Sequence, residues 1–128
     1  MVVDSSALVS ILLEEPKHEQ LFDKAVDSEI TLVGAPLALE TVMVVSGRSS
    51  ADARYQLAGL LRTIGAEIVP FTEEHYEAAL SAFLRYGKGR HPAALNFGDC
   101  MSYAFARVSG LPLLYTGNDF SKTDVQAA

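Results

Sequence analysis

The chain has 128 residues, of which 49% are hydrophobic, 20% charged and 9% aromatic, and its formal net charge is −6. This is the size and composition of one globular domain that can build a core without staples. The single cysteine, Cys100, excludes an internal disulfide and a CxxC zinc pair, and with no signal peptide in the sequence we expect a reducing, cytoplasmic compartment. No apolar run reaches the roughly 20 residues of a membrane helix, so no membrane association is expected. The negative charge argues against a generic coating of nucleic acid, but it is compatible with holding nucleic acid through metal ions.

Short apolar runs alternate with helical patterns along the chain, without a linker or repeat that would indicate a second domain. In chain order, the first half predicts a strand at Met1–Val3, a helix from Ser5 to Leu13, a helix from Pro16 through Val26, a strand at Ile30–Val33, a helix from Pro36 to about Ser46 that Gly47 stops, and a helix capped by Ser50 that ends at Gly65. The second half predicts a strand at Glu67–Phe71, a helix capped by Thr72, a loop at Tyr86–Pro92, a helix from Gly98 or Asp99 to Gly110, and a strand at Leu113–Tyr115 before a turn to Asp119. This alternation is typical of one α/β domain, residues 1–128, with a mostly parallel sheet of four to five short strands.

Four acidic residues lie where the apolar pattern makes a charge unexpected: Asp4, Glu40, Asp99 and Asp119. Asp4 follows the first predicted strand and Asp119 the last, and parallel sheets bind ligands at the carboxyl ends of their strands. Each acid alone has a local explanation, because aspartate caps helices and forms turns, and a helical glutamate is usually solvated or salt-bridged. Together, without a basic residue directly beside any of them, they are the ligands that Mg²⁺ or Mn²⁺ requires. The spacing alone leaves the two interpretations evenly balanced.

Five short motifs resemble one known family. They are Met1-Val2-Val3-Asp4-Ser5-Ser6-Ala7, Leu39-Glu40, Gly87-Lys88-Gly89-Arg90-His91, Leu95-Asn96-Phe97-Gly98-Asp99-Cys100 and Thr116-Gly117-Asn118-Asp119-Phe120. In this order they resemble the PIN-domain ribonucleases, and more specifically the VapC-type toxins of bacterial toxin–antitoxin systems. The resemblance runs from Val2 to Asp124. It implies an α/β fold of the PIN type, a three-layer α/β/α sandwich, and an endoribonuclease activity.

The resemblance also implies roles for individual residues and for partners. Asp4, Glu40, Asp99 and Asp119 match the catalytic acidic quartet, which binds one or two Mg²⁺ or Mn²⁺ ions in the family. Ser6, Asn96 and Thr116 match polar positions that support this site by hydrogen bonding, and Asp124 matches an accessory acid. One departure is Ala35-Pro36, where a hydroxyl residue often precedes the helix that carries the glutamate. The family further implies an RNA substrate, an inhibitory VapB-type antitoxin and a homodimer.

The expected chemistry is hydrolysis of an RNA phosphodiester by a metal-activated water, so no nucleophilic side chain is required. Asp4 and Asp99 are our choice for direct ligands, and Glu40 and Asp119 would complete the shell or hold metal-bound waters. Cys100 is then expected to be a small buried hydrophobe and not a catalytic thiol.

A basic loop offers a second kind of site. Lys88, Arg90 and His91 lie in a glycine-containing loop after Arg85, which is either a solvated surface or an edge that contacts RNA phosphates. The other histidines, His18 and His75, are expected to be solvated.

A protein partner would need an apolar surface. The first helices, together with Leu57, Leu60 and Leu61, either pack in the core or form a groove for an antitoxin or a second copy of the chain.

Other classes of protein fit the sequence less well. A phosphatase with an aspartyl nucleophile needs a second aspartate at the position of Ser6, a nucleotide-binding ATPase needs GxxxxGK[ST], and a phospho-receiver domain needs a lysine near the last strand. Two alternatives stay open: a non-catalytic PIN-like module that binds protein or RNA, and another metal-dependent phosphoesterase with clustered acids.

Overall fold

The sheet is four-stranded and entirely parallel, with strand order β3-β2-β1-β4. The computed structural model describes all residues, 1–128. The strands are β1 (Val2–Val3), β2 (Thr31–Gly34), β3 (Ala66–Val69) and β4 (Leu113–Leu114). The helices are α1 (Ser5–Leu12), α2 (His18–Val26), α3 (Ala35–Ser49), α4 (Arg54–Thr63), α5 (Glu73–Tyr86) and α6 (Phe97–Ser109).

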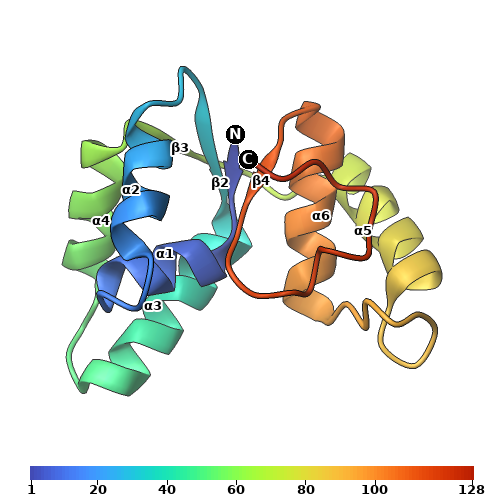
Figure 1. Ribbon diagram of the computed structural model, residues 1–128, viewed down its shortest axis with the longest axis horizontal. Helices are drawn as coiled ribbons and strands as arrows, with labels where there is room; N and C mark the ends of the chain where they lie inside the picture. Colours follow the sequence, from blue (N-terminus) through green and yellow to red (C-terminus); the bar gives the residue numbers. More distant parts are fainter.

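Helices cover both faces of the sheet, so the molecule has three layers (Figure 1). The first four helices, α1 to α4, lie on one face and contact one another around α1 and α3. Helices α5 and α6 pair on the other face, where α6 lies against β1, β2 and β4. The predicted α/β/α sandwich with a parallel sheet is therefore confirmed. None of the six helices is both long and apolar enough to span a bilayer.

The central strand β1 is short and buried on both of its faces. Val2 and Val3 of β1 are fully buried, and Val2 pairs with Leu32 on one side and Leu113 on the other. Strands enclosed in this way read as continuous apolar runs, as the sequence does here. The outer edge of β4 is closed by the C-terminal segment, since the N–H of Leu113 donates to the carbonyl oxygen of Gln126 at 2.8 Å.

The largest departure from the predicted elements is at the end of α3. Gly47 does not stop this helix, which continues to Ser49, and Ser50 lies in the left-handed region (φ 55°) at its C-terminus. Ser50 therefore ends α3 instead of capping the next helix, which starts after Ala53. A glycine inside a helix costs about 1 kcal/mol. Burial of Val45 and the bond from the Ser49 hydroxyl to the carbonyl oxygen of Val45 extend the helix in spite of that cost.

Burial decides the role of the residues proposed for a partner groove. Leu57, Leu60 and Leu61 of α4 are at most 8% exposed and belong to the main core. They pack inside the protein, so of the two alternatives that the sequence left open the structure supports core packing and not a docking groove. His75 also differs from expectation: its ring lies 4.4 Å from that of Phe105, and its Nδ1 accepts from the N–H of Thr72 in the cap of α5.

Candidate active site

The four acids that the sequence singled out come from four different parts of the chain and lie at one edge of the sheet. Asp4 directly follows β1, Glu40 lies in the second turn of α3 after β2, Asp99 in the first turn of α6, and Asp119 in the loop after β4. Because all strands are parallel, β1, β2 and β4 end at the same edge. The charges of Asp119, Asp4 and Glu40 all act on the carboxyl group of Asp99. The structure therefore brings the predicted quartet together.

Asp4 is a buried carboxylate that is held only by hydrogen bonds. It is 4% exposed, its Oδ2 accepts from the N–H of Ser6 at 2.9 Å, and its Oδ1 accepts from the hydroxyl of Ser102. Its backbone N–H donates to Leu114 of β4 at 2.9 Å, which fixes it to the sheet. Asp4 is thus also the N-cap of α1. A buried carboxylate without a basic partner is costly, and binding a cation would offset this cost.

Ser102 is a site residue that the sequence analysis missed. It is fully buried in α6, three residues after Asp99, so both side chains share one side of the helix. A small polar residue inside an otherwise apolar buried helix was the available signal. Its separation of 98 residues from Asp4 in the sequence hid the hydrogen bond between them.

Asp99 is held at the start of α6 by a reciprocal bond with Asn96. The N–H of Asn96 donates to Oδ2 of Asp99 and the N–H of Asp99 donates to Oδ1 of Asn96, both at 2.9 Å. Burial, followed by the charges of Asp119, Asp4 and Glu40, raises the pKa of Asp99 to about 6, against the opposing effect of the hydrogen bond from the N–H of Asn96. In the metal-free protein Asp99 therefore loses its proton at a higher pH than an ordinary aspartate does.

Glu40 approaches the first turn of α6 because residue 98 is a glycine. A Cβ atom at Gly98 would lie 3.1 and 3.2 Å from the two carboxylate oxygens of Glu40. The sequence analysis placed Gly98 only at a helix start, and the need for a missing side chain there appears only in three dimensions. None of the three ion pairs in the chain involves Glu40 or any other member of the quartet.

Ser6 and Thr116 connect two sides of the site. The hydroxyl oxygen of Ser6 in α1 accepts from the backbone N–H of Thr116 at 3.1 Å, at the start of the loop that carries Asp119. Gly117 follows with φ 92°, a conformation that glycine adopts without strain. The loop then exposes Asp119 to solvent. Ser6 and Asn96 thus make hydrogen bonds beside the acidic residues, whereas Thr116 takes part through its backbone.

The unusual start of α3 has a steric reason. The N-cap of α3 is Gly34, which makes no side-chain cap, in keeping with the absence of a hydroxyl residue before this helix. A Cβ atom at Gly34 would lie 2.0 Å from the ring of Phe105. Packing of α6 against the sheet therefore requires glycine where a side-chain cap would otherwise stand.

Asp124, the predicted accessory acid, pairs with other partners. It accepts from the hydroxyl of Tyr103 at 2.7 Å and from Arg85 at 3.1 Å, which pins the C-terminal segment to α6 and α5. The Tyr103 hydroxyl lowers the pKa of Asp124, and burial followed by this hydrogen bond raises the pKa of Tyr103 to about 12. Its charge is not among those that act on Asp99. A role for Asp124 in the site stays a prediction.

The basic loop lies between α5 and α6. Lys88 and Arg90 are exposed, and the guanidinium of Arg90 lies 5.0 Å from the ring centre of Phe83. His91 is half-buried: its Nδ1 accepts from the N–H of Ala93 at 3.0 Å. Lys88 and Asn96 border the same apolar groove of about 700 Å³, which places this loop beside the first turn of α6.

The donor set fits a hard divalent cation that keeps much of its water. The site offers carboxylates, and Cys100 next to Asp99 is buried, with a pKa raised by that burial. No three acidic, histidine or cysteine side chains converge closely enough to enclose a metal ion by themselves. Mg²⁺ is commonly held by one or two carboxylates and several waters, so this arrangement suits it and does not suit a closed zinc site.

Comparisons with known proteins agree with this geometry. Residues 1–126 match the PIN domain. Ribonuclease VapC36 of Mycobacterium tuberculosis is 44% identical over 98% of this chain and 91% of its own length. Ribonuclease VapC of Mycolicibacterium smegmatis is 42% identical over 99% of this chain and 98% of its own length.

A solved structure shows the same fold. The VapC20 toxin of Mycobacterium tuberculosis, described as cleaving the sarcin-ricin loop, superposes with a TM-score of 0.79 over 99% of this chain and 97% of that one. Its sequence identity is 17%, so it supports the fold alone. The chain belongs to the PIN-domain family, and within it to the VapC ribonucleases of toxin–antitoxin systems.

Proposed function

We propose that the chain is an endoribonuclease that hydrolyses RNA phosphodiester bonds with Mg²⁺ or Mn²⁺ bound at the acidic edge. The observation that carries this is the gathering of four carboxylates at one edge of the sheet without an ion pair to any of them. Their proximity and burial together raise the pKa of Asp99 to about 6. Such a cluster is unfavourable without a cation and favourable with one. The naming of the relatives as ribonucleases supports RNA as the substrate.

Each acid has a distinct part in this proposal. When bound, the cation supplies a water of lowered pKa and stabilises the leaving oxygen. Asp4 and Asp99 would be the direct ligands of that cation, because hydrogen bonds fix both carboxylates while Oδ1 of Asp99 accepts none from the protein. Glu40 and Asp119 complete the shell or orient metal-bound waters, one or two ions being compatible with this set. Asp124 would be the accessory acid, with a carboxylate that already accepts from Tyr103 and Arg85.

The experiment compares cleavage of a single-stranded RNA in Mg²⁺ or Mn²⁺ and in excess EDTA. The proposal requires cleavage only with the cation, and loss of cleavage in Asp4→Asn purified in parallel. The exposed Asp23 on α2 gives a matched control, since Asp23→Asn removes the same charge away from the site. Cleavage in EDTA would overturn metal dependence. RNA binding without cleavage by wild type would support the non-catalytic alternative instead.

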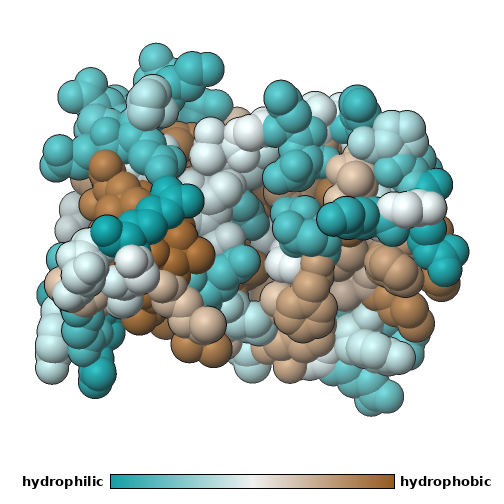
Figure 2. All heavy atoms as spheres, turned by 90° about the horizontal axis from the view of Figure 1, so that it is seen from below, coloured by the Kyte–Doolittle hydropathy of each residue, from teal (hydrophilic) through white to brown (hydrophobic).

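We also propose that a second copy of the chain covers an apolar face beside the site. This face comprises Leu39 and Met43 of α3, Tyr76, Leu80, Phe83 and Leu84 of α5, and Phe97 of α6, all of which are at least 38% exposed. Phe97 is 82% exposed and stands between two neighbouring apolar grooves, both of which it lines. Figure 2, which views the molecule from below, shows apolar side chains on the side of α5 as well as on the side of α1 to α4.

A protruding side chain next to a groove on the same face suits a two-fold dimer, because each copy would insert its Phe97 into the groove of the other. Patches of this kind mark protein interfaces in soluble proteins.

Inhibition by a VapB-type antitoxin is likewise proposed from family membership. The test is whether expression of the chain arrests growth and whether a co-expressed antitoxin relieves that arrest. Normal growth during expression of chain that cleaves RNA in vitro would count against the toxin role.

A further inference from the structure

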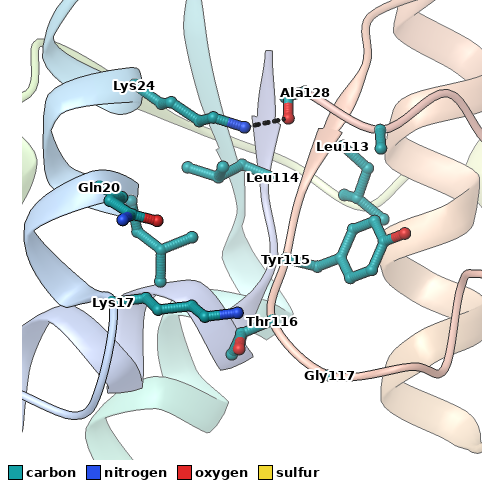
Figure 3. Close-up of a pocket in the computed structure, with 11 residues that line it drawn as sticks. Lys17, Gln20, Lys24, Leu113, Leu114, Tyr115, Thr116, Gly117 and Ala128 are labelled. Atoms are coloured by element: carbon teal, nitrogen blue, oxygen red, sulfur yellow. Dashed lines mark hydrogen bonds between the residues drawn. The ribbon is translucent and has the colours of Figure 1, made fainter.

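A groove lined by lysines runs along the outside of β4, next to the acidic edge. It measures about 300 Å³ and lies between α2 and the last strand (Figure 3). Lys17, Gln20 and Lys24 form one wall, and Leu113 to Gly117 with the C-terminal residues form the other. We propose that this groove binds backbone phosphates of the RNA strand on one side of the bond that is cleaved. This inference rests on the proposed ribonuclease function.

Charges on α2 and the turn before it are sorted by face. Lys17, Gln20 and Lys24 follow one another at helical spacings of three and four residues, so they form one stripe, and this stripe faces the groove. The acids of the same segment, Glu19 and Asp23, line a separate depression on the other side of α2. In a chain of net charge −6, a stripe with two lysines, an amide and no acid favours an anionic ligand.

The groove opens toward the active site. Its far wall includes Thr116 and Gly117, which begin the loop to Asp119, and the N–H of Thr116 is bonded to Ser6 beside Asp4. Figure 3 shows the amino group of Lys17 next to Thr116, at the lower end of the groove. A phosphate held by Lys17 would therefore lie next to the loop that carries a catalytic acid.

The two lysines have donors to offer. Lys17 forms no ion pair, because the three pairs of the chain use other residues. Lys24 donates one hydrogen bond to the carbonyl oxygen of Ala128 at 2.7 Å, and an ammonium group has two further donors. Lys24 lies seven positions after Lys17, the residue that precedes α2, and seven positions along a helix rise by about 10 Å. This corresponds to roughly three stacked nucleotides at about 3.4 Å each.

The acidic edge makes such cations necessary. Four carboxylates repel the phosphates of a strand except where the bound cation neutralises them, so flanking nucleotides need positive charge nearby. The loop with Lys88 and Arg90 provides it on the side of α5 and α6, whereas α2 lies on the opposite side of the sheet edge (Figure 1). The groove beside α2 supplies positive charge on this second side. The RNA strand would then cross the acidic edge between the basic loop and the groove.

The test measures binding of a fluorescent single-stranded RNA as a function of salt, in chain inactivated by Asp4→Asn. Removing one lysine–phosphate ion pair should lower the slope of log K against log salt by about 0.7, which is about fivefold weaker binding at 0.1 M salt. Lys17→Ala and Lys24→Ala should each show this effect, and Lys17→Arg should bind as the parent chain does. Arg62→Ala on α4, also exposed and unpaired, is the matched control and should change little.

A second arm locates the bound phosphates along the RNA. One RNA carries neutral methylphosphonate linkages on one side of the cleaved bond, and the other is unmodified. The parent chain should bind the modified RNA more weakly than the unmodified one. Lys17→Ala, which lacks the lysine that meets those phosphates, should bind the two RNAs equally. Equal slopes for Lys17→Ala, Lys24→Ala and Arg62→Ala would overturn the groove proposal. Because metal-dependent cleavage by wild type is measured separately, that result would leave the ribonuclease function standing. Absence of cleavage with normal RNA binding would overturn the function instead.

Discussion

Asp99 and Asn96 satisfy each other's backbone: each N–H donates to the side chain of the other residue at 2.9 Å. The carboxylate of Asp99 is therefore a helix cap and a member of the acidic quartet at the same time. The cap uses Oδ2 and leaves Oδ1 for a cation. The two interpretations that the sequence held in balance are thus compatible in one residue.

Asp99→Asn should separate the cap from the metal site. Asp99 is the third helical residue of the capping box, and the side-chain oxygen of an asparagine there can still accept from the N–H of Asn96. Helix α6 should therefore keep its start, while one of four repelling charges is removed. We expect a higher melting temperature than wild type in EDTA at neutral pH. Mg²⁺ at 100 times its dissociation constant should stabilise wild type by about 2.7 kcal/mol and the variant by much less. Thermal melting with and without Mg²⁺ measures both effects, and equal metal-induced shifts would mean that Asp99 is a cap only.

The raised pKa of Asp99 predicts a pH dependence of the metal-free protein. Burial first, and then the neighbouring acids, raise this pKa to about 6, whereas an unfolded aspartate titrates near 3.9. The folded chain binds more protons between about pH 4 and pH 6, so its free energy of unfolding should fall as the pH rises through that range and then level off. Water screens a half-buried carboxylate, so the expected loss is on the order of 1 kcal/mol.

Urea unfolding in EDTA across this pH range checks the sign. The profile of Asp99→Asn should fall less steeply than that of wild type, because the substituted side chain does not titrate. Parallel profiles would show that Asp99 has an ordinary pKa in the folded state.

Gly98→Ala should impair activity without destabilising the fold. The added Cβ would lie 3.1 Å from one oxygen of Glu40, so the glutamate must move, while the helix gains up to about 1 kcal/mol in propensity. We expect a loss of cleavage rate of about tenfold or more with an unchanged or higher melting temperature. Gly59→Ala in α4 is the control, since a Cβ there meets nothing within 4 Å. If both variants cleave as wild type does, the approach of Glu40 to α6 has no functional role.

Replacing Phe97 by a charged residue should abolish self-association. Phe97 is 82% exposed, so Phe97→Asp removes the protruding side chain of the proposed dimer without opening a cavity in the core. Sedimentation velocity should give a dimer for wild type and a monomer for the variant. Tyr55, 77% exposed on α4, supplies the control Tyr55→Asp, which should remain dimeric. A monomeric wild type at micromolar concentration would contradict the dimer.

The basic loop can be tested by salt dependence. Lys88→Ala and Arg90→Ala should each reduce the salt slope of RNA binding by about 0.7, because each removes one cation that neutralises a phosphate of a single strand. His91→Ala should weaken binding less, since its Nδ1 is engaged with the N–H of Ala93. The Mg²⁺-induced stabilisation should stay as in wild type. An unchanged slope in the lysine and arginine variants would make the loop an ordinary solvated surface.

The sequence by itself determined the succession of strands and helices along the chain and the parallel sheet, and it singled out the four acidic residues. These follow from local patterns: apolar runs such as Val2-Val3 and charges inside apolar stretches, as at Glu40. It failed at Gly47, where tertiary burial of Val45 outweighed a local stop signal.

Only the tertiary structure decided what depends on residues far apart in the chain. Ser102 reaches Asp4 across 98 residues, and the space at Gly98 exists for the carboxylate of Glu40 on another helix. It also decided which apolar residues are core, as for Leu57, and which are exposed, as for Phe97. Helical periodicity shows that a residue is apolar and on which face it lies. Which other element packs against that face is set by the long-range packing of the chain, which no local pattern records.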